Sequence, residues 1–291
     1  WIIEAKKKGI KLAILNGRIS TRSFRSYTRF LPFFRMVLAQ FDLLSMISNG
    51  DRERIIQIGA RAETVSVNGN SKYDMLIRST TPGMRENVRR ALQIAPDALV
   101  IVAGSTRSGE EEILLDAYKR ILTPFHDAVL ILAPRHLKRV TQITGLVKKK
   151  GLKCHLRSEL VSQGHTRKEG IIIIDCFGEL FNTYSAANIA FCGASLVPLG
   201  GQNPLEPAAW GTPLFHGPHM EDFSDAMQLL GAYNAGIEVT GAIDLAEKVI
   251  FYLNNPDLLA QKGMAAKKAL MEGSNVAEVQ ASLIKGLACK G

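Results

Sequence analysis

The sequence predicts an α/β protein built from two doubly wound, Rossmann-like domains. Short apolar runs alternate with amphipathic helical segments along most of the chain, which is the pattern of a mostly parallel sheet with helices on both faces. Polar and glycine-rich residues follow several of these runs, at the end where parallel sheets bind ligands. The pattern stops and restarts at residues 68–82, which are rich in turn residues and predict a domain boundary.

Residues 1–72 form the first predicted domain. The chain opens on an amphipathic helix with no strand before it, so we expect the C-terminal half of a domain that begins upstream. A polar loop at residues 16–22 suits either an anionic group or solvent. The predicted elements are a helix at 1–8, a strand at 11–15, a helix at 33–39, a strand at 43–47, a helix at 51–58 and a strand at 64–67.

Residues 73–291 form the second predicted domain. Ser108 and Glu111 have the spacing of a capping box and predict a helix start. The polar residues 157–168 predict a surface loop. The predicted strands lie at 98–103, 128–133, 152–156, 171–174, 189–192, 213–215 and 236–239. The predicted helices lie at 85–92, up to about 122, up to 150, up to 187, at 222–230, at 243–253, from 256 and at 275–287.

The stretch at residues 193–219 is the strongest candidate for a binding site. A buried strand leads into a glycine loop that includes Gly201, and Asn203 and Pro204 then occupy the N-cap and first positions of a helix. A helix N-terminus reached through glycines offers N–H groups to a phosphate. Glu206, in the first turn, repels a phosphate, so we expect it to accept hydrogen bonds from sugar hydroxyls. A purely structural turn is the alternative.

Three more loops follow strands at the same predicted edge. Ser105 and Thr106 offer hydroxyl and N–H groups at a helix start. Arg135 can form a fork with a phosphate or a structural ion pair, and His136 can serve as a cap or a ligand contact. Residues 177–179 can present backbone N–H groups and an apolar face to a nucleotide base. The four loops together predict a site that holds a nucleotide.

The composition favours an anionic partner and excludes several kinds of site. The net charge is +9, which suits a phosphorylated substrate or an acidic membrane surface, while the scarcity of interleaved aromatics argues against nucleic acid. The four cysteines are widely spaced, so we expect neither disulfides nor a metal site. No Walker, Gly-x-Gly-x-x-Gly or Gly-x-Ser-x-Gly motif occurs, and no apolar run reaches the about 18 residues of a membrane span.

Six motifs lie in a fixed order between residue 1 and about residue 275. The most specific is Gly200-Gly201-Gln202-Asn203-Pro204-Leu205-Glu206-Pro207-Ala208, followed by Gly217-Pro218-His219. The others lie at residues 16–23, 69–74, 103–111, 133–136 and 178–180. In this order they resemble the motifs of the 3-deoxy-D-manno-octulosonic acid (Kdo) transferases.

The resemblance implies a GT-B fold and an inverting transfer of Kdo from CMP-Kdo to a lipid A precursor. It places the enzyme on the anionic cytoplasmic face of the inner membrane, with CMP-Kdo as donor substrate, no further cofactor and no nucleic-acid partner. Glu206 would take the ribose hydroxyls and Arg135 would face the phosphate. The expected donor-binding residues, from the loops and the resemblance together, are Ser105, Thr106, Pro134, Arg135, Phe177, Gly178, Glu179, Gly201, Asn203, Pro204, Leu205 and Glu206.

Two departures from the family pattern limit what this chain is expected to do. The family usually has histidine at the position of Gln202, and glutamine cannot carry a charge. The family's general base is a glutamate in a glycine loop of the first domain, and its membrane anchor lies earlier still, so we name no catalytic residue and expect a fragment that is inactive alone. The alternatives are a nucleotide-sugar epimerase of the same architecture and a non-catalytic nucleotide-binding module, and titration with CMP against UDP distinguishes the epimerase.

Overall fold

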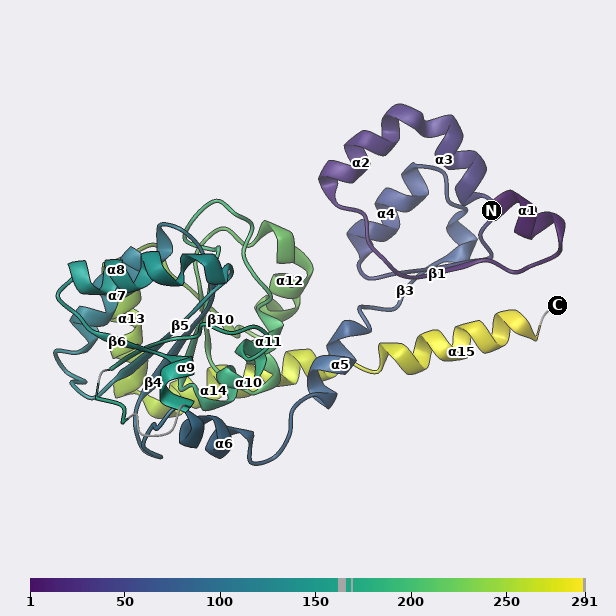
Figure 1. The fold of residues 1–291 in the computed structure, drawn as a ribbon. Helices are drawn as coiled ribbons and strands as arrows, with labels where there is room; N and C mark the ends of the chain where they lie inside the picture. Colours follow the sequence, from purple (N-terminus) through teal and green to yellow (C-terminus); the bar gives the residue numbers. More distant parts are fainter. Residues whose placement is uncertain (162–165, 169, 290–291) are drawn as a thin grey trace. The chain divides into compact units, whose positions relative to one another are not determined.

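The computed structural model describes residues 1–161, 166–168 and 170–289, and Figure 1 shows their fold. The chain divides into two compact units. Unit 1 comprises Trp1–Met75 and the segment from Met271 to the C-terminus, and unit 2 comprises Leu76–Leu270. The last helix therefore belongs to unit 1, whereas the sequence predicted it in the second domain. None of the helices in the described residues is long and apolar enough to cross a bilayer.

Unit 1 contains a parallel three-stranded sheet in the order β1-β2-β3. Its central strand is buried, with Leu44 and Met46 fully enclosed. The strands are β1 (Ala13–Gly17), β2 (Leu43–Met46) and β3 (Val65–Val67). The helices that belong to it are α1 (Ile2–Lys7), α2 (Thr21–Tyr27), α3 (Leu31–Leu38), α4 (Asn49–Gln57) and α15 (Val276–Ala288), while α5 (Lys72–Arg78) lies where the two units join in sequence.

Two helices occur where the sequence predicted irregular chain. Helix α2 starts within the predicted loop because the Ser20 side chain accepts the N–H of Ser23 at 3.1 Å and caps it. Helix α5 interrupts the turn-rich stretch at 68–82, and the Asn70 side chain accepts the N–H of Lys72 at 3.1 Å at its start. In both places a local cap stabilises a helix whose apolar periodicity is weak.

Helix α15 is tied to the sheet of unit 1 by buried polar contacts. The Gln280 amide donates to Asn16 Oδ1 and to Ser45 Oγ, each at 3.2 Å. Asp74 accepts the N–H of Ala277 in the first turn of α15 at 2.7 Å. These partners lie far from α15 in sequence, which explains why periodicity alone did not assign the helix to unit 1.

Unit 2 contains a parallel seven-stranded sheet in the order β10-β9-β8-β4-β5-β7-β6. All seven predicted strands occur, and their ends lie within three residues of the predicted positions. They are β4 (Val100–Thr106), β5 (Val129–Pro134), β6 (Cys154–Leu156), β7 (Ile171–Ile173), β8 (Ile189–Cys192), β9 (Leu214–His216) and β10 (Gly236–Glu238).

The helices of unit 2 follow the expected alternation with one addition. Helix α9 lies in the stretch predicted as a surface loop, of which residues 162–165 are outside the described residues. The helices are α6 (Met84–Ala91), α7 (Glu110–Ile121), α8 (Val140–Lys149), α9 (Arg157–Val161), α10 (Leu180–Thr183), α11 (Leu205–Ala209), α12 (Ser224–Ala232), α13 (Ala242–Asn254) and α14 (Pro256–Glu272), the last of which ends in unit 1.

The sheet of unit 2 is covered on both faces. Figure 1 shows helices on both sides of the strands. Along β4, Ile101 and Ala103 belong to the core formed with α7, α8 and α13, while Val100 and Val102 belong to the core beside α6 and α10. This is why the strand reads as a continuous apolar run. The chain leaves β4 toward β5 and leaves β8 toward β9, so the connections diverge between β4 and β8. Parallel α/β sheets bind ligands at such a switch point.

Candidate functional site

The prediction that Asn203 is the N-cap of α11 is wrong, because Pro204 holds that position, and this helix start offers few donors to an anion. Asn203 Oδ1 accepts the N–H of Leu205 at 3.1 Å, and the helix begins one residue later than expected. Pro204 and Pro207 have no N–H group. Only the N–H of Glu206 remains in this turn, so side chains rather than a row of backbone donors must provide most of any anion binding here.

Glu206 and Arg135 lie within electrostatic reach of each other at the carboxyl edge of the sheet. Burial raises the pKa of Glu206 above its usual value, while a 3.4 Å hydrogen bond from the Asn203 amide and the charge of Arg135 act in the opposite direction. Arg135 is exposed and has no side-chain hydrogen bond or ion pair within the part of the chain that the structure describes. A half-buried carboxylate from α11 and an available guanidinium from the loop after β5 therefore lie close enough to act on one ligand.

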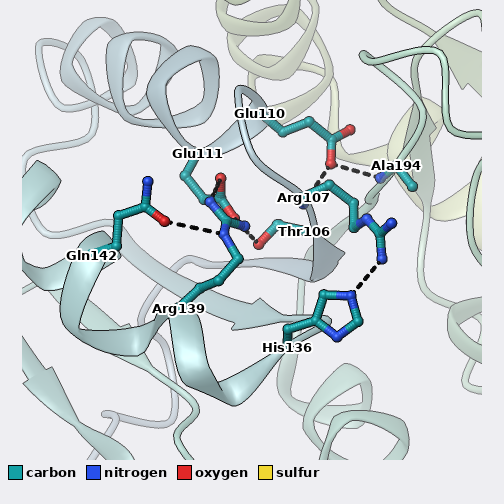
Figure 2. A network of polar contacts seen from close by, with 8 residues as sticks. All are labelled: Thr106, Arg107, Glu110, Glu111, His136, Arg139, Gln142 and Ala194. Atoms are coloured by element: carbon teal, nitrogen blue, oxygen red, sulfur yellow. Dashed lines mark hydrogen bonds and ion pairs between the residues drawn. The ribbon is translucent and has the colours of Figure 1, made fainter.

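Thr106 holds the loop after β4 together. It is fully buried, and its hydroxyl donates to Glu111 Oε1 at 2.9 Å (Figure 2). Arg139 completes the cluster with two hydrogen bonds to the same carboxylate, at 2.6 and 3.0 Å. The prediction that Thr106 contacts a ligand is therefore wrong for its side chain. The capping box of Ser108 and Glu111 is also wrong, because Gly109 is the N-cap of α7 and Glu111 is engaged by Thr106 and Arg139.

Glu110 joins the loops that follow β4 and β8. This fully buried carboxylate accepts the backbone N–H groups of Ala194 at 2.6 Å and Arg107 at 2.9 Å (Figure 2). It also accepts those of Ser195 and Leu196, at 2.9 and 3.0 Å. The sequence analysis did not identify this role. The signal that could have found it is the run of three glutamates at residues 110–112, because three consecutive residues at a helix start cannot all face solvent.

Arg107 and Arg135 follow directly on the ends of β4 and β5. Thr106 is in register with Pro134, and the Arg135 N–H donates to the Thr106 carbonyl at 3.1 Å. Arg107 Nη1 is 2.9 Å from His136 Nε2 (Figure 2). Partial desolvation and four surrounding cations, Arg107 first, lower the pKa of His136. Because a guanidinium can only donate, Nε2 of the imidazole accepts this hydrogen bond. The sequence analysis did not select Arg107.

The loop after β7 contains one exposed aromatic ring, that of Phe177, and one carboxylate in an ion pair, that of Glu179. Phe177 is 82% exposed, and Gly178 has a φ of +84°, which glycine adopts easily. Glu179 accepts a hydrogen bond from Arg157 Nε at 2.6 Å. The apolar face expected at Phe177 is present, whereas the carboxylate of Glu179 is already paired with an arginine from α9.

Most of the remaining predicted residues are buried and support the loops of the site. Leu205 is fully buried and Pro134, Gly201 and Pro204 are also buried, so their side chains support the loops. Gly201 has a φ of +78°, and a Cβ there would lie 2.5 Å from the sulfur of Met220. Ser105 lies near the carboxyl end of β4 and is half-buried. Its φ of +55° is a strained conformation for serine. No group of three metal-ligating side chains occurs among the described residues.

Comparison with known proteins identifies the family. Residues 1–75 match the model of the 3-deoxy-D-manno-octulosonic-acid transferase (kdotransferase) N-terminal region. The chain is 29% identical to the 3-deoxy-D-manno-octulosonic acid transferase of Haemophilus influenzae over 96% of its own length and 64% of that protein. It is 34% identical to a bifunctional glycosyltransferase/methyltransferase of Fusobacterium nucleatum over 85% of its length and 38% of that protein. The chain belongs to the Kdo transferase family.

Solved structures agree with this assignment and with the fold. The C-terminal CMP-Kdo binding domain of WaaA from Acinetobacter baumannii matches with a TM-score of 0.59 and 25% identity, over 67% of this chain and 98% of that domain. Anabaena HepE in complex with UDP matches with a TM-score of 0.65 over 99% of this chain and 75% of that one, and its 17% identity supports the fold alone. The fold is of the GT-B type. The chain spans 38–64% of the length of the first curated relatives it matches.

Proposed function

We propose that this Kdo transferase family chain binds CMP-Kdo in unit 2 and serves the inverting transfer of Kdo to a lipid A precursor in lipopolysaccharide synthesis. The observation that carries the proposal is that Arg135, directly after β5, and Glu206, in α11, lie within electrostatic reach of each other at the carboxyl edge of a parallel sheet. A nucleotide needs both a cation for its phosphate and an acceptor for its ribose hydroxyls. These two side chains supply them within one site.

Each side chain has a role that follows from its chemistry. Glu206 accepts the two ribose hydroxyls, which are better partners for a buried carboxylate than an anion is. Arg135 binds the phosphate, since its guanidinium is exposed and has no carboxylate bonded to it among the described residues. Phe177 offers its exposed ring to the cytosine face. Asn203 orients Glu206 through its amide.

We further propose that this chain by itself transfers no Kdo. Inverting transfer requires a base that removes the proton of the attacking acceptor hydroxyl while CMP leaves from the opposite side. The resemblance assigns this base to a glutamate in a glycine loop that no motif of this sequence matches. The chain is incubated with CMP-Kdo and lipid IVA, and the lipid is analysed by mass spectrometry. We expect no more Kdo-modified lipid than in a reaction without protein. Measurable transfer would contradict this proposal, and the donor-binding residues would then have to be searched for a base.

The acceptor and the location form a second part of the proposal. Residues 16–41 of unit 1 contain five arginines and no acidic residue. Phe30 and Phe33 of this stretch are more than half exposed, and Arg25 and Arg29 are exposed beside them in sequence. Cations next to exposed aromatic rings suit an anionic lipid surface. We propose that unit 1 faces the lipid acceptor at the cytoplasmic surface of the inner membrane.

Calorimetric titration with CMP and UDP tests the donor proposal. The two nucleotides share the ribose and differ in the base and in the number of phosphates. We expect CMP to bind more tightly than UDP. Tighter binding of UDP would favour a UDP-sugar enzyme such as an epimerase, and absence of binding by both nucleotides would refute a donor site in unit 2.

A further inference from the structure

Two arginines follow the paired ends of β4 and β5 at the edge of the sheet. Arg107 and Arg135 each follow the last paired residue of their strand, Thr106 and Pro134, and the Arg135 backbone N–H donates to the Thr106 carbonyl at 3.1 Å. Both guanidinium groups are near enough to His136 for their charges to act on its imidazole. Arg107 donates its side-chain hydrogen bond to a neutral imidazole, His136, at 2.9 Å (Figure 2). Neither guanidinium forms an ion pair within the described part of the chain. Adjacent guanidinium groups repel each other, and an arriving anion removes this repulsion.

Glu206 acts on Arg135 through its charge without an ion pair, and the carboxylates nearest Arg107 are engaged elsewhere. The carboxylate of Glu111 is taken by Arg139 and Thr106. The carboxylate of Glu110 is buried in a ring of backbone N–H groups below the loop. Lys138 adds another cation near His136. The loops therefore hold two available forks where only one phosphate charge is expected.

We propose that Arg107, oriented by His136, binds a second anionic group of the donor, the carboxylate of its sugar, while Arg135 binds the phosphate. The inference rests on the proposed function, because a CMP-activated 2-keto acid sugar carries its carboxylate on the carbon that bears the phosphate. The two charges of such a donor are therefore next to each other, and both arginines lie close enough to His136 for their charges to reach it. A planar guanidinium pairs with a carboxylate through two parallel hydrogen bonds. Arg107 thus selects sugars with an acidic group.

Two ligands separate the carboxylate from the phosphate. CMP-Kdo carries both groups, and the methyl phosphodiester of CMP carries the same single phosphate charge without the sugar carboxylate. By calorimetry on the full chain, R107Q should weaken CMP-Kdo binding by about 10- to 30-fold, the range for a partly exposed charged hydrogen bond. The same variant should leave the methyl diester within about twofold. R107K, which keeps the charge and loses the fork, should fall between wild type and R107Q.

Two further variants show where each charge acts. Arg135→Gln should weaken both ligands alike, and Lys138→Gln, at an exposed neighbouring cation, should change both by less than about twofold. An equal loss of both ligands in R107Q would make Arg107 a phosphate contact and overturn the inference, as would no loss in either. Wild-type protein that binds neither ligand would overturn the proposed function together with this inference. Wild-type binding that R107Q does not alter would overturn the inference alone.

Discussion

Glu206 combines two demands that oppose each other within a single residue. Ribose hydroxyls donate to an ionised carboxylate, whereas burial disfavours that ionised form and raises its pKa. The unliganded fold therefore holds Glu206 in an environment that suits its protonated form better than the unfolded chain does. Such a group lowers the free energy of unfolding as the pH rises through its pKa, and its bound hydroxyls offset that loss.

Replacing Glu206 by glutamine should separate these effects. We expect CMP binding at pH 7 to weaken by about 1–3 kcal/mol, because a charged hydrogen-bond acceptor is lost. The melting temperature of the unliganded protein should rise, because the cost of a buried charge is removed. As the pH falls toward the raised pKa, the wild-type advantage in CMP affinity should shrink, and using the ratio of the two dissociation constants cancels the titration of CMP itself. A ratio that stays constant from pH 7 to pH 5 would exclude Glu206 from the ribose contact.

The buried guanidinium of Arg89 has a structural role. Its guanidinium is 4% exposed and donates to carbonyl oxygens of two separated segments, among them Ala186 at 2.9 Å and Ala95 at 2.8 Å. Burial lowers the pKa of this arginine, and the surrounding carbonyl groups hold the charge without a carboxylate bonded to it in the described chain. One side chain thus closes the turn before β4 onto the segment before β8.

Replacing Arg89 by methionine should destabilise unit 2 by about 3 kcal/mol, because several buried carbonyl groups lose their donor. Chemical denaturation followed by circular dichroism measures this change. The matched control is Arg90→Met, since Arg90 is the exposed next residue of α6 and should shift stability by less than about 0.5 kcal/mol. Equal effects of the two substitutions would show that the buried hydrogen bonds of Arg89 do not stabilise the fold.

At the scale of elements, the close approach of β4 and β8 depends on Gly193. A Cβ at this position would lie 2.5 Å from the Ser105 carbonyl oxygen and 2.6 Å from that of Gly104, both of which are backbone atoms. The loops after the two strands carry the proposed donor site. Their spacing therefore requires glycine at the end of β8.

Gly193→Ala should separate these loops. We expect a loss of about 1–3 kcal/mol in stability, from overpacking against rigid backbone, and a weaker affinity for CMP. Gly145→Ala is the control, because a Cβ within α8 would meet no atom within 4 Å and alanine favours a helix by up to about 1 kcal/mol. Thermal unfolding and CMP titration of both variants provide the comparison, and a CMP affinity unaffected by Gly193→Ala would refute a link between loop spacing and the site.

Strands were easier to predict from the sequence than the shorter helices. The five interior strands of unit 2, β9, β8, β4, β5 and β7, are mostly apolar runs buried on both faces, and burial imposes that composition directly. Helices α2, α5 and α9 were missed because they are short and begin through caps such as Ser20 and Asn70 rather than through a long apolar face. The assignment of α15 failed because Gln280 finds its partners through tertiary structure alone.

The candidate site was predictable to the extent that parallel strands share an edge. That rule correctly brought Arg135 and Glu206 into one place. It did not reveal which polar groups are already hydrogen-bonded or ion-paired within the protein. Thr106 and Glu179 are satisfied by partners from other elements, and the pairing of Thr106 with Glu111 and Arg139 requires the fold to be known.

At the scale of the whole molecule, the charge is distributed unevenly along the chain. The net charge is +9, and the acid-free stretch at residues 16–41 contributes five arginines to it. Each cation near an anionic bilayer adds about 1 kcal/mol of attraction, which salt screens within about a Debye length. Such a distribution favours binding of unit 1 to acidic lipid.

The chain should therefore co-sediment with vesicles that contain phosphatidylglycerol and not with vesicles of phosphatidylcholine alone. Combined replacement of Arg25, Arg29 and Arg35 by glutamine should remove most of this binding, and high salt should do the same for wild type. Replacement of Lys119, Arg120 and Lys149 in unit 2 by glutamine keeps the same change in net charge as a control. Equal losses in both triple variants would assign the binding to net charge rather than to this stretch of unit 1.

The carboxylate of Glu110 also bears on how fast a ligand can bind. It occupies the backbone N–H groups of Ala194, Ser195 and Leu196 from inside the protein, so the loop after β8 is already held in place before any ligand arrives. A receptor whose loops need no ordering spends little conformational entropy on binding. Association is then governed by diffusion and by the attraction of exposed arginines for an anion, and differences between nucleotides appear in how long each one stays.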